Sequence, residues 1–211
     1  MRYRQAVAEA RKRRSNGEAS RQRILDAAAE IAGERGYEGT SINLVSERSG
    51  LPASSIYWHF ADKDALIAAV IDRTFGRWTA TLDRPVAVPD GATGEDLLRA
   101  GLQRTGRALA EFPAFLRLGL MLILERRPEE PSARERFLHA RRVTSSRVGD
   151  LYRAYFVDLD ARAVDELVTL TIALADGLFI ASEVDGIALD QAFDLMATAI
   201  LGAARQLGQP D

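Results

Sequence analysis

Apolar residues recur every three or four positions along most of the chain, which is the spacing of one face of an α-helix. In residues 20–35 they occur as Ile24, Ala28 and Ile31, with a parallel row at Leu25, Ala29 and Ala32, and Gly36 ends the pattern. No segment shows the strict alternation of apolar and polar residues that is typical of a half-buried strand. The pattern therefore predicts an all-α chain.

Two short helices are predicted between Thr40 and Lys63. Thr40 and Ser41 precede Ile42 and Val45, so a hydroxyl can accept a backbone N–H at the start of the first helix. Ser49-Gly50 supplies the break and Pro52 suits the start of the next helix. Burial of Ile56 and Phe60, four residues apart, would turn Ala53, Ser54, Tyr57 and Trp58 outward. Helix, short turn with Gly and helix is the helix-turn-helix pattern, whose second helix enters the major groove of DNA.

Further helices are predicted to the end of the chain. Ala61-Asp62 can cap a helix that runs to about Leu82, and Leu66 and Val70 give it an apolar side. Two Pro and two Gly make residues 83–94 a loop. Beyond it we expect helices near 94–111, 113–126, 131–156, 160–184 and 188–207.

Two of these helices are apolar nearly all round, over Phe112–Leu124 and Leu167–Ala181, which is typical of helices buried in a bundle or against another subunit. The last pair, 160–184 and 188–207, is rich in Ala and Gly, which permits close helix packing. We therefore expect a homodimer through this pair. Arg117 and Asp176 lie inside the two apolar stretches and each needs a partner there, either the other residue or a polar group of a ligand.

Composition narrows the possible classes of protein. With 47% apolar and 27% charged residues the chain is expected to fold, and with no Cys it has neither disulfides nor thiolate metal sites. No apolar run of membrane-spanning length lacks a charge, and the Arg-rich start lacks the apolar core of a signal peptide. We expect a cytoplasmic protein.

The net charge of −2 is unevenly distributed. Residues 1–63 hold 11 Lys and Arg against 8 Asp and Glu, whereas residues 64–211 hold 17 against 22. A basic N-terminal third on an acidic remainder is expected if one end meets nucleic acid. Within residues 1–17, Ser15-Asn16-Gly17 is predicted to interrupt any helix, leaving a basic arm that is either a solvated tail or a contact to DNA phosphates or a minor groove.

The segment GYEGTSINLVSERSGLPASSIYWHFADKDAL resembles the TetR family of one-component transcriptional regulators, specifically over about residues 20–67. The resemblance implies a basic arm (1–17), a helix-turn-helix DNA-binding domain (18–65) and a ligand-binding and dimerisation domain (66–211). It also implies DNA contacts, to phosphates and to base edges, from Thr40, Ser41, Asn43, Ala53, Ser54, Ser55, Tyr57, Trp58, His59 and Lys63. Tyr57 and Trp58 have the alternative of simply packing in the core, and Lys63 that of a solvated residue at a helix start.

The second helix of the motif departs from the family pattern at Pro52 and Ser54, which stand where Ser and Gly are common. It also lacks Arg, Gln and Asn, the side chains that read guanine or adenine through two hydrogen bonds. Ala53 can touch a thymine methyl group, and Ser54 or Tyr57 can form single hydrogen bonds. Specificity is therefore expected to be shared with Asn43, with DNA shape and with the N-terminal arginines.

In the family the C-terminal helices enclose an apolar cavity, and its ligand changes the spacing of the two DNA-reading helices of the dimer. The resemblance thus implies a small, largely apolar effector. Its candidate contacts, which are equally candidates for plain core packing, are Trp78, Phe115, Arg117, Leu118, Met121, Leu122, Tyr152, Phe156, Asp176 and Phe179.

The expected function is repression of transcription by a homodimer on a near-palindromic operator, with release by the effector. The alternative is a constitutive or architectural DNA-binding protein without an effector. An enzyme is not expected, because no phosphate-cradling Gly loop, nucleophile motif or metal cluster is present, and no cofactor is implied. With two His in the chain and no carboxylate at ligand spacing, His59 is not expected to be a metal ligand.

Overall fold

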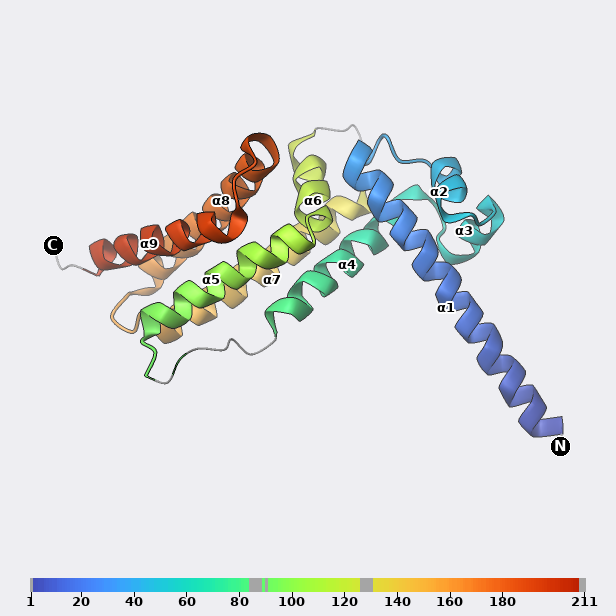
Figure 1. Cartoon of the computed structure of the whole chain (residues 1–211), viewed down its shortest axis with the longest axis horizontal. Coiled ribbons are helices and arrows are strands. Elements are labelled where there is room, and N and C mark those ends of the chain that lie inside the picture. Colours follow the sequence, from blue (N-terminus) through green and yellow to red (C-terminus); the bar gives the residue numbers. More distant parts are fainter. Residues whose placement is uncertain (1, 84–88, 90, 126–130, 209–211) are drawn as a thin grey trace. The chain divides into compact units, whose positions relative to one another are not determined.

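The computed structural model describes residues 2–83, 89, 91–125 and 131–208, with side chains from residue 16 onward. Within these ranges the chain forms nine α-helices and no strand (Figure 1), so the all-α prediction is confirmed. The helices are α1 (Arg2–Arg35), α2 (Ile42–Ser49), α3 (Ala53–His59), α4 (Lys63–Leu82), α5 (Gly94–Glu111), α6 (Ala114–Leu124), α7 (Ser132–Tyr155), α8 (Ala161–Asp185) and α9 (Leu189–Leu207).

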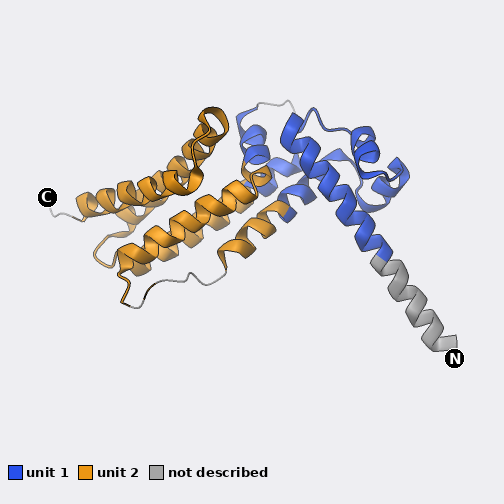
Figure 2. Ribbon diagram, viewed as in Figure 1, with its two compact units in different colours: residues 1–73, 117–137 blue, residues 74–116, 138–211 orange. Residues whose placement is uncertain are grey.

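The helices divide between two compact units (Figure 2). Unit 1 comprises Met1–Arg73 and Arg117–Phe137, and unit 2 comprises Thr74–Leu116 and Leu138–Asp211. Helices α4, α6 and α7 each contribute residues to both units. The functional boundary expected near residue 65 stays a prediction.

Unit 1 is built on the apolar stripe of α1. Ile24, Leu25 and Ile31 are fully buried, and Val45 of α2 and Ile56 of α3 are buried with them. Each such side chain stabilises the fold by roughly 1.5–3 kcal/mol relative to an exposed position. This shared core fixes α2 and α3 against α1.

Helix α1 does not stop where the sequence suggested. It runs without interruption through residues 15–17, so the expected break at Ser15-Asn16-Gly17 is wrong. Ser20 donates its hydroxyl to the Asn16 carbonyl oxygen one turn earlier (2.8 Å), and Gly17 faces the Trp58 ring. A single Gly costs a helix interior only about 1 kcal/mol, which local packing of this kind can offset.

Unit 2 is a helical bundle in which α9 packs on α5 and on α8. A Cβ at Gly106 of α5 would lie 2.7 Å from the Leu189 carbonyl oxygen and 2.9 Å from the Phe193 ring, so the close approach of α5 and α9 requires glycine. Arg99 of α5 forms a 2.9 Å ion pair with Asp194 of α9, which lowers the pKa of that carboxyl group. The close contact at Gly106 and the Arg99–Asp194 ion pair hold α5 and α9 together.

The charged side chain inside α8 has a different partner from the one considered from the sequence. Arg141 of α7 donates two hydrogen bonds to the Asp176 carboxylate, at 3.0 Å and 2.8 Å. The pairing of Asp176 with Arg117 is therefore wrong, because α7 supplies the cation instead. The sequence shows that a charged residue within an apolar helix needs a partner. It does not show which neighbouring helix provides that partner.

Helix α8 is long and apolar enough to cross a membrane, judged by length and composition alone, yet only 22% of its most apolar window is buried within the chain. Its exposed side chains form one stripe at helical spacing that includes Ala173, Gly177, Ile180 and Val184. Asp165 and Glu166 lie near its start and Asp176 is paired. The stripe is thus an apolar face that no described part of the chain covers.

Candidate nucleic-acid interface

Helices α2 and α3 are joined by a short turn whose geometry follows from its sequence. Ser41 caps α2 by accepting the Leu44 N–H (3.3 Å), and Gly50 ends it with a φ of 65°, a left-handed conformation that glycine adopts without strain. Arg23 of α1 donates to the Ser49 carbonyl oxygen (2.6 Å), and Ser46 donates to that of Leu51 (2.7 Å). The predicted helix-turn-helix is present, and side chains on both sides of the turn hold it.

One face of α3 is buried and the other is open. Ile56 and Phe60 are buried, as predicted, whereas Tyr57 and Trp58 are 57% and 76% exposed. Ser54 is exposed beside them, and Ala53 is half-buried. An indole and a phenol that cover no core in the described chain form a surface suited to contact with another molecule.

Among the candidates in α2 and just before it, exposure varies. Ser41 and Asn43 are exposed, so both can reach a ligand. Thr40 is 1% exposed, and its hydroxyl donates to the Gly36 carbonyl oxygen (2.8 Å). Thr40 therefore stabilises the turn after α1, and the phosphate contact expected from it is not available to its buried hydroxyl. The Thr-Ser pair looked like one capping unit in the sequence, but only Ser41 caps α2.

Lys63, at the start of α4, is held by the loop after α1. Its Nζ lies 4.2 Å from the centre of the Tyr37 ring, 3.3 Å from the Tyr37 carbonyl oxygen and 3.5 Å from Glu38 Oε2. An ammonium group has three donors, so one N–H remains for a phosphate oxygen. These contacts hold the Lys63 ammonium, the group predicted to contact phosphate, in a defined position next to the helix-turn-helix.

Tyr37 and Asp64 extend this cluster to α7. Burial raises the pKa of Tyr37 to about 12, with further increases from the negative charges of Asp64, Glu38 and Asp62. The Asp64 carboxylate also accepts the backbone N–H groups of Ser132 (2.8 Å) and Ala133 (3.3 Å), the first residues of α7. Asp64 thus caps α7 and faces the Tyr37 side chain.

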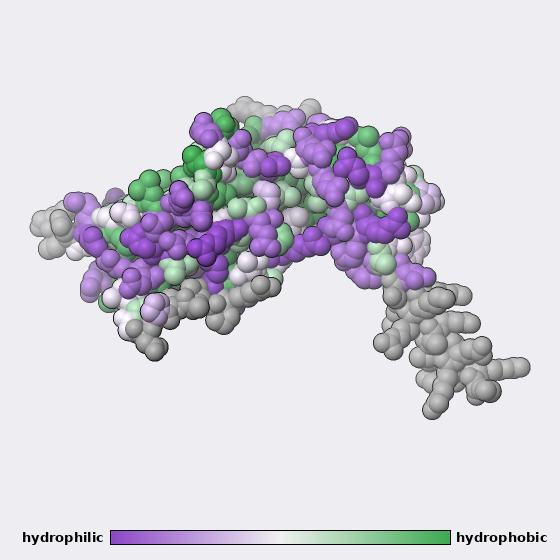
Figure 3. Space-filling model, in the orientation of Figure 1, coloured by the Kyte–Doolittle hydropathy of each residue, from purple (hydrophilic) through white to green (hydrophobic). Residues whose placement is uncertain are grey.

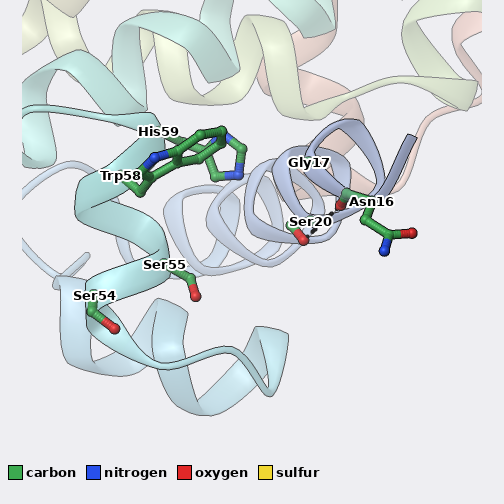
Figure 4. Close-up of a pocket in the computed structure, with 7 residues that line it drawn as sticks. All are labelled: Asn16, Gly17, Ser20, Ser54, Ser55, Trp58 and His59. Atoms are coloured by element: carbon green, nitrogen blue, oxygen red, sulfur yellow. Dashed lines mark hydrogen bonds between the residues drawn. The ribbon is translucent and has the colours of Figure 1, made fainter. Parts of the chain in front are cut away.

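An open groove of about 390 Å³ lies between α1 and α3 (Figure 4). Its lining is rich in hydroxyl and amide groups, with the Trp58 and His59 rings edge to face at 4.5 Å between centres. The lining residues are Asn16, Gly17, Ser20, Ser54, Ser55, Trp58 and His59. The sequence prediction included the four residues from α3 but missed Asn16, Gly17 and Ser20. The predicted helix began at Ser20, so the i, i+4 spacing of Asn16 and Ser20 was not recognised as one helix face.

The electrostatic state of the groove depends on His59. Burial lowers its pKa below the ordinary value of 6.5, the positive charge of Arg21 lowers it further, and Glu18 partly opposes the shift. The imidazole is therefore neutral at pH 7 in the free protein. A phosphate oxygen in the groove would favour the protonated ring, since opposite charge raises the pKa of His.

The ten ligand candidates do not fall in one compact unit. Arg117, Leu118, Met121 and Leu122 belong to unit 1, where Met121 packs its methyl group against Gly36. In unit 2, Trp78 and Phe115 stack with centres 5.9 Å apart, and Tyr152 contacts both Phe156 (5.5 Å between ring centres) and the Thr171 hydroxyl (2.6 Å). Phe179 is buried and Asp176 is paired with Arg141. Their contact with a ligand stays a prediction.

No group of three or more His, Cys, Asp or Glu side chains is placed to hold a metal ion in the part of the chain that the structure describes.

Comparison with known proteins bears on the same segment. Residues 24–70 match the family model described as bacterial regulatory proteins, tetR family. This segment is therefore similar to the DNA-binding domain of tetR-family regulators. The match includes the buried stripe of α1, all of α2 and α3, and the start of α4 with Lys63.

Two named relatives match less than half of this chain. The HTH-type transcriptional repressor KstR of Mycobacterium tuberculosis is 32% identical over 93 residues, which are 44% of this chain and 41% of that repressor. The HTH-type transcriptional regulator AcrR of Shigella flexneri is 34% identical over 61 residues, which are 29% of this chain and 28% of that regulator. The matched part spans less than half of the length of either relative.

Solved structures share the fold over most of the chain. A TetR-like transcriptional regulator from Rhodococcus sp. RHA1 has a TM-score of 0.67 at 18% identity, covering 86% of this chain and 93% of that one. The fatty acid degradation regulator FadR from Bacillus halodurans has a TM-score of 0.68 at 15% identity, covering 86% and 94%. The shared fold therefore extends beyond the helix-turn-helix and includes most of the chain.

Proposed function

We propose that this protein is a transcriptional regulator, and specifically a repressor, that binds operator DNA through the outward face of α3. The observation that carries the proposal is the pair of exposed aromatic side chains, Tyr57 and Trp58, on a helix whose opposite side is fixed by Ile56 and Phe60. A helix held this way after a short turn is the element that enters a major groove in helix-turn-helix proteins.

Phosphate contacts would surround this face. Exposed Ser41 at the start of α2, the hydroxyl-lined groove between α1 and α3, and Lys63 each offer donors to phosphate oxygens. Basic residues in the first 14 positions of the sequence would add positive charge to the N-terminal part of the protein: Arg2, Arg4, Arg11, Lys12, Arg13 and Arg14. These contacts would set affinity and position, not sequence preference.

Base recognition would rely on weaker contacts. Exposed Asn43 of α2 can form two hydrogen bonds to adenine, and Ser54 and Tyr57 can form single ones. Trp58 would cover sugar and base-edge surface. With no Arg, Gln or Asn on α3, we expect a substantial part of the specificity to depend on DNA shape.

We propose that the regulator is a homodimer through α8 and α9. The uncovered stripe of α8 ends in Ile180 and Val184, and α9 adds exposed Leu195. Figure 3 shows hydrophobic surface over these two helices. Ala173, Gly177 and Gly202 on the same exposed faces permit close approach of a second copy. A dimer would present two α3 helices to successive major grooves of a palindromic site.

We further propose that a small, largely apolar effector releases the protein from DNA, and that the protein acts in the cytoplasm. Support comes from the fold shared with regulators such as FadR, whose name refers to fatty acid degradation. Release requires only that the effector bind more tightly to the form that does not fit DNA.

Selection of bound duplexes from random DNA tests the proposal. We expect enrichment of a near-palindrome whose half-sites lie about one helical turn apart. Trp58→Ala should lose this enrichment, whereas Val157→Ala, which alters an exposed apolar side chain outside the proposed interfaces, should keep it. Recovery of unenriched DNA by the unaltered protein would contradict sequence-specific regulation and leave only general DNA binding.

A further inference from the structure

Trp78 of α4 has a buried indole N–H that donates to no hydrogen-bond acceptor in the described structure. The residue is 5% exposed. An indole nitrogen is a donor only, and buried tryptophans usually place it against an acceptor because an unpaired buried donor is unfavourable. The donor therefore has an unmet hydrogen bond, which an acceptor on a bound molecule would complete.

The surroundings of this donor are aromatic. The Trp78 ring stacks on Phe115 of α6 with planes 18° apart, and Phe75, one turn earlier on α4, lies 6.0 Å from Trp78 and 5.2 Å from Phe115 between ring centres. All three residues belong to unit 2. An apolar ring surface with a single directed polar group is the usual composition of a small-molecule site.

We propose that Trp78 Nε1 donates a hydrogen bond to a carbonyl oxygen of a neutral, largely apolar effector, whose hydrocarbon part lies against the Phe75, Trp78 and Phe115 rings. This inference rests on the effector-responsive function proposed above and specifies its ligand class. A carbonyl needs only one donor. A buried carboxylate would need a cation or several donors, and the indole supplies neither charge nor a second N–H.

The opposing interpretation is that Trp78 only fills the core. Its N–H would then be a local packing defect, and Trp78→Phe would remove the unpaired donor without consequence for binding. Both interpretations expect Trp78→Phe to fold, since the substitution keeps an aromatic ring at the site. Ligand preference separates them.

Equilibrium dialysis with matched pairs of compounds tests the proposal. The probes are indanone with indane, and medium-chain methyl ketones with the 1-alkenes of equal length. We expect the unaltered protein to bind each ketone about tenfold more tightly than its hydrocarbon partner, the effect of one buried hydrogen bond. In Trp78→Phe the difference within each pair should fall below about threefold, whatever the smaller ring does to the affinity for the hydrocarbon, whereas Phe75→Leu should weaken both members of a pair alike and keep the difference.

Three results would overturn the proposal. The unaltered protein could bind both members of each pair equally, it could bind none of the probes, or Trp78→Phe could keep the preference for the carbonyl compound. Displacement of the selected DNA by the same probes is measured in parallel. It distinguishes a failure of the Trp78 site from a failure of the proposed effector-responsive regulation. Release of DNA without carbonyl preference supports an effector-responsive regulator and contradicts the role of Trp78. Carbonyl preference that depends on Trp78, with no change in DNA binding, supports the site and contradicts its regulatory use.

Discussion

At the scale of single residues, Lys63 links the fold to the proposed DNA contact. Its ammonium is oriented by the Tyr37 ring and carbonyl oxygen, and Glu38 partly balances its charge. A preoriented cation loses little side-chain freedom when a phosphate arrives. Lys63 is therefore expected to contribute to binding on any sequence.

Lys63→Gln should weaken binding to selected and unrelated duplexes by a similar factor, and should reduce the slope of log affinity against log salt concentration by about 1. The measurement is a titration of labelled duplex at several salt concentrations. Arg153→Gln, which removes an exposed cation of α7 in unit 2, is the control and should leave the slope unchanged. An unaltered slope in Lys63→Gln would mean that the ammonium stays with Tyr37 and Glu38.

His59 gives the interface a dependence on pH. Its pKa is lowered in the free protein by burial and by Arg21, so the folded state binds fewer protons than the unfolded state as pH falls through 6.5. Stability contributed by the neutral ring is thus present above pH 6.5 and is lost as pH falls through the lowered pKa. Affinity for DNA should change in the opposite direction, because a nearby phosphate favours the charged ring.

We therefore expect DNA affinity to rise between about pH 7 and pH 5.5 while the melting temperature falls. His59→Gln should reduce both dependences. Binding and thermal unfolding measured on the same buffers provide the check. Parallel pH profiles for the original protein and His59→Gln would exclude a phosphate contact by the imidazole.

At the scale of helices, the turn between α2 and α3 depends on one glycine. Gly50 has a φ of 65°, and a Cβ there would also lie 3.3 Å from Arg23 Nη2. Gly50→Ala should lower the free energy of unfolding by about 1 kcal/mol or more. Gly76→Ala is the matched control, because Gly76 lies within α4 with nothing within 4 Å of an added Cβ. This substitution should raise the free energy of unfolding by up to about 1 kcal/mol. Chemical denaturation measures both, and equal changes would contradict the role of the left-handed turn.

Most helix positions were predictable because local signals agree with the fold. Ser41, Gly50 and Asp62 mark helix ends through their own side chains or backbone, and the structure uses each of them in this way. Beyond Thr93 the predicted helices differ from the observed ones by two residues or fewer. Prediction failed where the outcome depended on distant residues: α1 passes through Gly17 beside Trp58, and Thr40 is enclosed by its loop.

The candidate site was predictable only in part for the same reason. Helical spacing on α3 was enough to separate Ile56 and Phe60 from Tyr57 and Trp58. It did not reveal that α1 supplies one wall of the groove, that Arg141 pairs with Asp176, or that Trp78 lacks an acceptor. These are contacts between helices that are far apart in the sequence, and no periodicity encodes them.

At the scale of the whole molecule, the proposed dimer accounts for the uncovered face of α8. Val184 is 75% exposed, and Ile180 lies one turn before it on the same stripe. Val184→Arg should shift the protein from dimer to monomer in sedimentation experiments with little change in helix content, because the side chain touches little within its own chain. Affinity for a palindrome should then fall steeply, since each half-site would be bound separately.

Val157→Arg is the control for this experiment, since Val157 is 78% exposed but lies between α7 and α8 and not on the stripe. It should remain dimeric. A Val184→Arg protein with the same mass in solution as the control would show that α8 and α9 do not form the contact between subunits.

Iodide quenching of tryptophan fluorescence tests the central claim most directly. The chain has two tryptophans, and only Trp58 is exposed enough for iodide to reach. The account predicts strong quenching of the free protein, loss of that quenching when the selected duplex is bound, and no accessible signal in Trp58→Phe. Quenching of Trp58 that stays unchanged while the duplex is fully bound would show that DNA lies elsewhere, and would contradict the assignment of α3 as the recognition helix.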